Sequence, residues 1–335
     1  MGPRDLTRSL LLLLPVLYAA CRGQTLSSPA PLSMRDQHPV ELTALYPKPR
    51  PFRIQEPGPH VLGLDTDWTN LWLLDESLPN DLSIDGELVR IELRLGWGLG
   101  HDMDLEVGIP LVYASGGAMD GLIEAWHDVF NLAQSGRTRY PRDLYDISFQ
   151  TTTESGPSQG YGLEEDRVGL GDVPVHLAWA PFRGEWNLCA RGSVELPTGS
   201  ESRGFGNGGF DWGLSVQGAW HQGPLAVFLW GGWTWIATPD RAGAGGFAYA
   251  DRPFLGGGFE WAFLERTSVL LQAEVHRSVL DELDDPHANR DQAILMGGFR
   301  HRFSDDLALD LGIGENVHAD LVPDVTLHVG LRLDL

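Results

Sequence analysis

Alternation of apolar and polar residues is clearest at the C-terminal end of the chain. From Val325 to Leu335, every second residue is apolar. The residues between them are polar or small: Thr326, His328, Gly330, Arg332 and Asp334. Because successive side chains of a β-strand point to opposite faces, this pattern predicts a strand with one apolar and one polar face.

The same period of two recurs along most of the chain. Clear copies lie at 88–98, 102–112, 186–196, 210–221 and 268–278. Weaker copies lie near 60–69, 167–181, 224–237, 253–264, 291–303 and 306–314. We therefore predict an all-β, antiparallel fold of about twelve strands, each of the length that a tilted strand needs to cross a bilayer.

The gaps between the predicted strands alternate in length. Long gaps lie near 70–86, 113–166, 197–208, 238–252, 280–290 and 315–322. Short gaps lie at 98–102, 182–185, 221–223, 264–266 and 303–306. Outer-membrane β-barrels have short periplasmic turns and longer external loops. The pattern thus predicts a transmembrane barrel over 60–335, with its apolar face toward lipid and its polar face toward the lumen.

Composition narrows the possible partners. The net charge of -22 argues against nucleic acid, because phosphates bind basic surfaces. Two cysteines cannot build a zinc cluster or a disulfide framework, and no cofactor is expected. The 12 Trp and 41 Gly fit a barrel with interfacial aromatic residues and tight turns.

The N-terminus has the features of a targeting segment. Arg4 and Arg8 precede an apolar stretch that ends at Ala19 and Ala20, which predicts a signal peptide over 1–20 and export to the outer membrane. Cys21 follows directly, and whether it is lipidated stays open. Residues 21–59 are rich in Pro and Ser without a period, and predict an extended periplasmic arm or a segment that folds back into the lumen.

The longest loop, 113–166, contains a helical pattern over 118–132. Its apolar residues recur at helical spacing, and four polar residues occupy the opposite face: Asp120, Glu124, His127 and Asp128. Such side chains can converge on a divalent cation, or form a solvated polar face. No established ligand spacing is matched, so no metal site is predicted.

Three stretches resemble a known family. They are R-D-Q-H-P-V at 35–40, S-G-G-A-M-D-G-L-I-E-A-W-H-D-V-F at 115–130, and G-L-G-D-V at 169–173. Together they resemble a family of Gram-negative outer-membrane proteins of unknown function, over nearly the whole mature chain. The resemblance implies a barrel in the outer membrane and implies no activity for any residue.

The polar face of the predicted strands carries both signs of charge. The predicted lumen-lining residues are Arg90, Glu92, Arg94, Asp104, Glu106, Arg191, Glu195, Glu274, His276, Arg300, Arg302, Asp310 and Arg332. If paired, these charges would brace and fill the lumen; if segregated, they would form a transverse field suited to passing ions.

These features predict a passive pore for ions or small polar solutes. A closed structural or interaction barrel is the alternative, because mixed charges can also plug a lumen. A lipid hydrolase is a third hypothesis, because His276-Arg277-Ser278 resembles the H-x-S of outer-membrane phospholipases. Val279 and Leu280 depart from that motif, and His276 lies on the polar face, whereas the catalytic side chains of those enzymes face the lipid. No enzyme is therefore predicted. Expected partners are outer-membrane lipid, lipopolysaccharide and the barrel-insertion machinery, and the oligomeric state stays open.

Overall fold

The computed structural model is a closed antiparallel barrel of 12 strands, which confirms the predicted fold class. It describes residues 26, 29–50, 57–75, 80–130, 141–153, 156–157, 161–163, 165–182, 184–240, 248–281, 289–317 and 325–335. The predicted signal peptide and Cys21 lie outside these residues.

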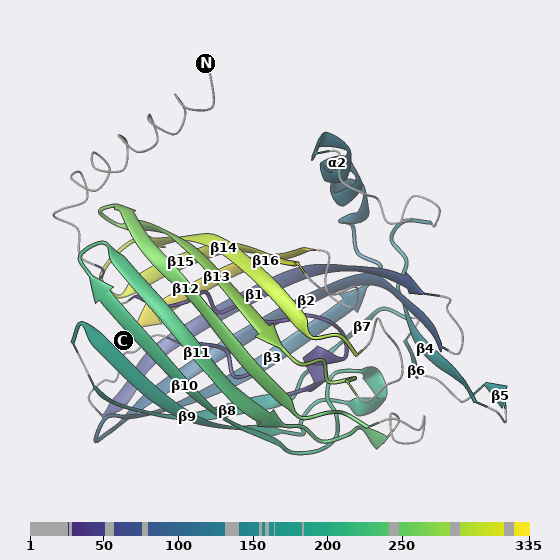
Figure 1. Ribbon diagram of the computed structural model, residues 1–335, viewed down its shortest axis with the longest axis horizontal. Coiled ribbons are helices and arrows are strands. Elements are labelled where there is room, and N and C mark those ends of the chain that lie inside the picture. The colour runs from purple at the N-terminus through teal and green to yellow at the C-terminus, as the bar shows by residue number, and fades with distance from the viewer. Residues whose placement is uncertain are drawn as a thin grey trace.

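Each barrel strand pairs with its neighbours in sequence (Figure 1). The strands are β1 (Gly58–Asp75), β2 (Asn80–Gly100), β3 (Met103–Ser115), β7 (Arg167–Leu170) with β8 (Val173–Phe182), β9 (Trp186–Leu196), β10 (Asp211–Gln222), β11 (Leu225–Trp235), β12 (Arg252–Leu264), β13 (Thr267–His276), β14 (Gln292–Arg302), β15 (Leu307–Asn316) and β16 (Val325–Asp334). β7 and β8 both pair with β3 and together act as one strand of the wall.

The barrel closes where β1 pairs with β16, from Val61 opposite Asp334 to Asn70 opposite Val325. Closure leaves the barrel without a free edge, so the backbone groups of its wall are hydrogen-bonded within the sheet, as a bilayer requires. The start of β1 and the end of β16 lie at the same end as the short turns, where the Leu335 backbone N–H donates to the His60 carbonyl at 3.0 Å.

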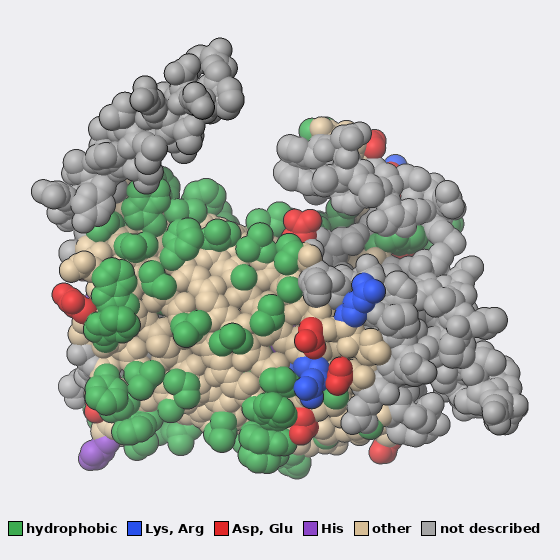
Figure 2. Space-filling model, in the orientation of Figure 1, with side chains coloured by type: hydrophobic (Ala, Val, Ile, Leu, Met, Phe, Trp, Pro, Cys, Tyr) green, Lys and Arg blue, Asp and Glu red, His purple; other side chains and the backbone are tan. Residues whose placement is uncertain are grey.

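The outer face of the wall is apolar, as the alternation predicts. Large apolar side chains are exposed along every strand: Leu62, Leu64, Leu93, Ile109, Leu111, Leu177, Leu188, Val194, Leu214, Val216, Val227, Leu229, Leu255, Phe259, Leu271, Val275, Leu295, Phe299, Leu311, Ile313, Val329 and Leu331. Figure 2 shows such side chains spread over the wall, with the charged side chains mostly toward its edges. An apolar band of this kind is typical of a surface solvated by lipid.

Paired tryptophans lie near the two rims of the wall. Trp186 and Trp220 lie beside the short turns with their ring centroids 6.4 Å apart. Trp212 and Trp235 stack at the other end, with centroids 3.9 Å apart. Amphipathic rings at both rims are typical of the aromatic girdles of outer-membrane barrels.

The first residues of β2 extend past the wall at the end opposite the short turns. There they pair with β4 (Asp146–Thr153), from Asn80 opposite Thr151 to Asp85 opposite Asp146. β4 is extended by β5 (Gly156–Pro157) and β6 (Tyr161–Leu163). Within the predicted range 118–132 the structure has helix α2 (Asp120–Phe130). Burial raises the pKa of Tyr145, just before β4, to about 12, so its hydroxyl is neutral at ordinary pH.

Two short 3₁₀ turns lie at Glu41–Thr43 and Glu201–Arg203. No helix among the residues that the structure describes is long and apolar enough to cross a membrane.

The lipid-facing assignment predicts a position-dependent cost of charge. Leu229 lies near the middle of β11 and is 61% exposed. We expect Leu229→Arg to lower the free energy of unfolding by about 2–4 kcal/mol in lipid vesicles, because a cation at the bilayer midplane loses its hydration.

The matched control is Leu264→Arg, at the end of β12 beside a short turn, where the cost is about 0–1 kcal/mol. Denaturant titration followed by tryptophan fluorescence measures both. Equal costs at the two positions would contradict the membrane-spanning orientation.

Candidate functional site

An N-terminal segment fills the barrel lumen. Residues 29–50, here called the lumenal hairpin, run inside the wall (purple in Figure 1). Just before it, the Leu26 backbone N–H donates to the Gly223 carbonyl at 3.3 Å, at a short turn. The hairpin turns around at 41–43, where Thr43 lies 3.4 Å from the Tyr249 hydroxyl at the opposite end. The following residues, 44–50, here called the descending limb, run back toward the short-turn end, where β1 begins.

The structure therefore corrects the predicted periplasmic arm over 21–59 for these residues. Of the two placements that composition allowed, residues 29–50 take the one inside the lumen. Ala30, Leu32, Gln37 and Leu45 are 0% exposed.

Two glutamines of the wall bind the hairpin backbone as a neighbouring strand would. Gln272 accepts from the Leu32 N–H at 2.7 Å and donates to the Leu32 carbonyl at 3.2 Å. Gln217 does the same for Arg50, at 2.9 and 2.7 Å. A carboxamide presents a donor and an acceptor, so one side chain satisfies both backbone groups of a residue. This explains how a segment without regular structure is buried.

The tip of the hairpin is built by the motif at 35–40. The Asp36 carboxylate accepts from the His38 N–H at 2.7 Å, and its other oxygen lies 3.4 Å from His276 Nε2 of the wall. The Arg35 guanidinium donates to the carbonyls of Glu41 and Ala44. These contacts stabilise the turn of the hairpin, so the motif at 35–40 has a structural role at its tip.

Wall residues fasten the tip from the other side. Arg252, 1% exposed, pairs with the Glu41 carboxylate and donates to the Leu45 carbonyl. The second Glu41 oxygen accepts from the Val279 N–H at 3.2 Å. Arg252 also lies over the Tyr46 ring, 4.9 Å from its centroid. A buried guanidinium with several acceptors and a carboxylate is well compensated for its lost hydration.

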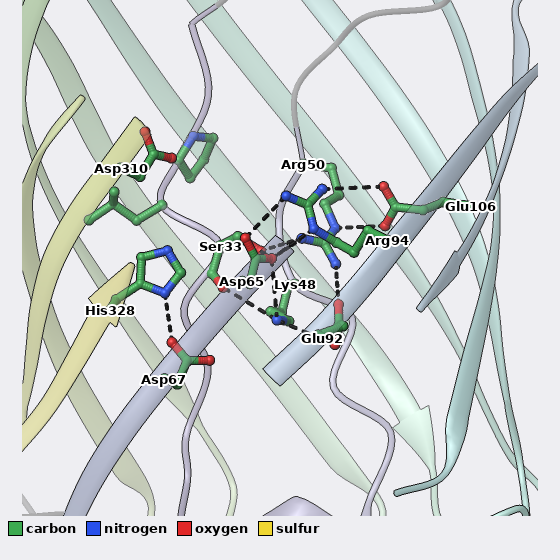
Figure 3. A network of polar contacts seen from close by, with 12 residues as sticks. Ser33, Lys48, Arg50, Asp65, Asp67, Glu92, Arg94, Glu106, Asp310 and His328 are labelled. Carbon is green, nitrogen blue, oxygen red and sulfur yellow. Dashed lines mark hydrogen bonds and ion pairs between the residues drawn. The ribbon is translucent and has the colours of Figure 1, made fainter. Parts of the chain in front are cut away.

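The descending limb places two cations among carboxylates of β1, β2 and β3 (Figure 3). Arg50 lies 3.6 Å from Asp65, 3.1 Å from Glu92 and 2.9 Å from Glu106. Lys48 lies 3.6 Å from Glu92 and 4.0 Å from Asp65. We call Asp65, Glu92 and Glu106 the acidic triad.

The wall also supplies cations to the acidic triad. Arg94 Nε donates to Asp65 at 2.7 Å, and its Nη1 lies 3.7 Å from Glu106. Arg90 pairs with Glu92. Each carboxylate of the acidic triad therefore has at least one wall arginine and one hairpin cation.

Two other lumenal carboxylates, Glu260 and Asp310, are paired with arginines of the wall itself. Glu260 on β12 pairs with Arg300 at 3.0 Å and Arg302 at 2.6 Å, both on β14. Arg300 also pairs with Asp310 at 2.7 Å. The hairpin contributes backbone groups here, with the Ala30 N–H donating to Glu260 and its carbonyl accepting from Arg300.

All thirteen predicted lumen-lining residues point to the interior, as their burial and contacts place them. Of the two arrangements considered, the described charges are mostly paired. Sequence reasoning did not name four charged residues of the same interior: Asp65, Asp67, Arg252 and Glu260. It offered a segment folded back into the lumen as one alternative for residues 21–59, but not the ion pairs of that segment with the wall.

A cavity of about 50 Å³ remains near the short turns. Its lining includes Arg50, Arg94, Asp104, Glu106 and Arg191. This is room for roughly one or two waters. Arg50 of the hairpin lines this cavity, so a solute passing along the barrel axis meets the hairpin.

Comparison with known proteins identifies the family of the chain and solved structures with a similar fold. The family model described as "Protein of unknown function (DUF3187)" matches residues 9–334. The chain belongs to this family. No match is found among curated proteins.

Among solved structures, this DUF3187 chain is similar to the COG4313 outer membrane channel from Pseudomonas putida F1. The TM-score is 0.51 at 14% sequence identity, covering 84% of this chain and 97% of that chain. It is also similar to the NanC porin, with a TM-score of 0.48 at 9% identity, covering 82% and 100%. The first likeness shows that the DUF3187 chain has the fold of an outer-membrane barrel.

The polar face of α2 in the DUF3187 chain is engaged locally. Asp120 accepts from Asn70 Nδ2 at 3.1 Å and from the Asp143 N–H at 2.9 Å. Glu124 pairs with Arg142. Asp128 is exposed, and the His127 side chain lies outside what the structure describes. Within the described residues, no group of three or more His, Cys, Asp or Glu side chains could hold a metal ion.

The His276-Arg277-Ser278 segment lies at the end of β13. The His276 side chain is fully buried and faces Asp36 and Glu274 in the lumen, at 3.4 and 3.7 Å. Ser278 is buried and accepts from the Leu280 N–H at 3.1 Å. The imidazole therefore faces the hairpin and not the lipid.

The tip contacts predict that Arg252 holds the hairpin in place. We expect Arg252→Ala to free residues 41–45, because breaking a buried pair leaves an uncompensated charge at a cost of about 3–5 kcal/mol. Backbone hydrogen exchange, followed by mass spectrometry, should become faster by at least about tenfold in that segment.

The control is Arg277→Ala. Arg277 pairs with Asp281 at 3.6 Å, and both side chains are about 40% exposed, so the pair contributes about 0–1 kcal/mol. Unchanged exchange at 41–45 in Arg252→Ala would show that the hairpin does not depend on this arginine.

Proposed function

We propose that this protein is a passive channel of the outer membrane for ions or small polar solutes, occupied in this structure by its own N-terminal hairpin. The observation that supports this most is the way the hairpin is held. It contacts a charged wall through side chains, and both of its ends lie at the same end of the barrel. It can therefore leave the lumen without breaking a pair of barrel strands.

The energetics of the lumen are compatible with such a movement. When water enters a barrel, charged side chains that lose their ion pairs become hydrated instead. The net contribution of such ion pairs to stability is therefore small compared with their Coulomb attraction. The wall needs no rearrangement, because its strands are hydrogen-bonded to one another on both sides. The fold, shared with a protein known as an outer membrane channel, supports the same function.

The proposal includes the path to the membrane. A signal peptide over 1–20 would direct export, and the short turns would face the periplasm, since short turns are periplasmic in outer-membrane barrels. The hairpin would then enter from the periplasmic side. Lipid and lipopolysaccharide would solvate the apolar band, after insertion by the barrel-insertion machinery.

A closed structural barrel is the second candidate, and one observation favours it. The hairpin buries Ala30, Leu32 and Leu45 completely, as a permanent core would. The two functions differ in whether the hairpin ever leaves the lumen.

Single-channel conductance in a planar bilayer distinguishes these functions. We expect full-length protein to be mostly closed with brief openings, and Lys48→Ala/Arg50→Ala to be open at least about tenfold more of the time, because it removes the two charges that hold the descending limb.

Heat-modifiable migration on a gel verifies that each variant is folded. Folded protein that gives no conductance steps, with and without the two substitutions, would contradict the channel and leave the closed barrel.

A further inference from the structure

The acidic triad brings negative charges close together on neighbouring strands, which is unfavourable unless positive charges lie beside them. Asp65 and Glu92 are directly opposite one another in the pairing of β1 with β2. Both point into the lumen, where they are 1% exposed. Like charges directly opposite each other on one face destabilise a sheet, more so where water is excluded. This wall therefore requires cations.

The wall itself supplies too few of them. Arg90 and Arg94 stand on either side of Glu92 and provide two guanidinium groups for the three carboxylates. Lys48 and Arg50 of the hairpin provide two further positive charges, and each contacts both Asp65 and Glu92. When the hairpin leaves, the group of ion-paired side chains changes from net positive to net negative.

A further buried carboxyl group interacts with the same Arg90. Glu195, 4% exposed, lies in the field of the like charges of Asp211 and Asp172 as well as of Arg35 of the hairpin and Arg90 of the wall. Among the residues that the structure describes, its Oε2 atom has no hydrogen-bond partner. A donor that enters the lumen beside Arg90 would satisfy it.

From this geometry we infer that the acidic triad is a binding site for a cationic solute with ammonium or guanidinium groups, and that Lys48 and Arg50 occupy it as an internal ligand. The inference rests on the proposed channel function. The solute class follows from the occupants, because a guanidinium fits carboxylates at hydrogen-bonding distance and an ammonium bridges two of them.

The ion pairs of Glu260 do not share this property. Glu260 is paired with Arg300 and Arg302 of the wall itself, and the hairpin brings only backbone groups to it. The departure of the hairpin leaves those ion pairs intact. Cation preference is thus expected to depend on the acidic triad and not on lumenal carboxylates in general.

The test uses full-length Lys48→Ala/Arg50→Ala protein in a planar bilayer with a gradient of KCl. We expect K⁺ to permeate over Cl⁻ by on the order of tenfold, the ratio that about 1.4 kcal/mol of interaction free energy gives. Adding Glu92→Gln should remove most of this preference. Adding Glu260→Gln is the matched control, with the same charge removed from the same lumen, and should keep it.

Spermidine, a probe with several ammonium groups, should block the current in the Lys48→Ala/Arg50→Ala protein and lose at least about tenfold in apparent affinity with Glu92→Gln. If Glu92→Gln does not fold, as judged by heat-modifiable migration, Glu106→Gln replaces it.

A current without cation preference would overturn the inference and leave the channel function standing, as would equal effects of Glu92→Gln and Glu260→Gln. Absence of current in every folded variant would overturn the channel function itself.

Discussion

Charge compensation inside a space of low dielectric is the constraint on which the rest of this structure depends. Ionised side chains that lose their hydration must find opposite charges and hydrogen bonds within reach. At Glu260 the wall itself supplies the opposite charges, because two arginines of β14 pair with that carboxylate. On the side of β1 to β3 it does not, and the lumenal hairpin completes the balance.

The same requirement determines how a segment without regular structure can be buried. Residues 29–50 form no barrel strand, so their backbone groups need partners other than a ladder. Gln217 and Gln272 act as substitutes for a neighbouring strand, and Asp211 accepts from the Leu45 N–H at 2.9 Å. The polar side chains of the wall therefore line the lumen and also form specific hydrogen bonds with the hairpin.

The sequence was sufficient for the wall. Alternation is a local property, so the strands and the inward orientation of Arg90, Glu92 and Arg94 could be predicted from neighbouring residues alone. β1 was harder, because Thr66 interrupts the apolar side of its pattern between Leu64 and Trp68, which hid the inward orientation of Asp65 and Asp67. The alternating gap lengths predicted that the short turns lie together at one end of the barrel.

The contents of the lumen could not be derived in the same way. The hairpin has no period, and its partners lie far away in the chain: Gln217 is 167 residues from Arg50, and Gln272 is 240 residues from Leu32. The stretch at 35–40 was singled out by its resemblance to a known family, but the tip that it builds is held by Arg252 of β12 and by Val279, which lies beyond the end of β13. The acidic triad, likewise, is evident only from the contacts of its carboxylates with Lys48 and Arg50 of the hairpin.

The entry and exit of the hairpin at one end also permit a simple order of assembly. Because neither limb continues out of the far end, no part of the chain has to be threaded through a finished barrel. The β1–β16 seam can close first around an empty, water-filled lumen, and the hairpin can dock afterwards as a folded-over loop. Newly inserted protein would then pass through an unplugged stage, and the last step of its maturation would be the sealing of the membrane.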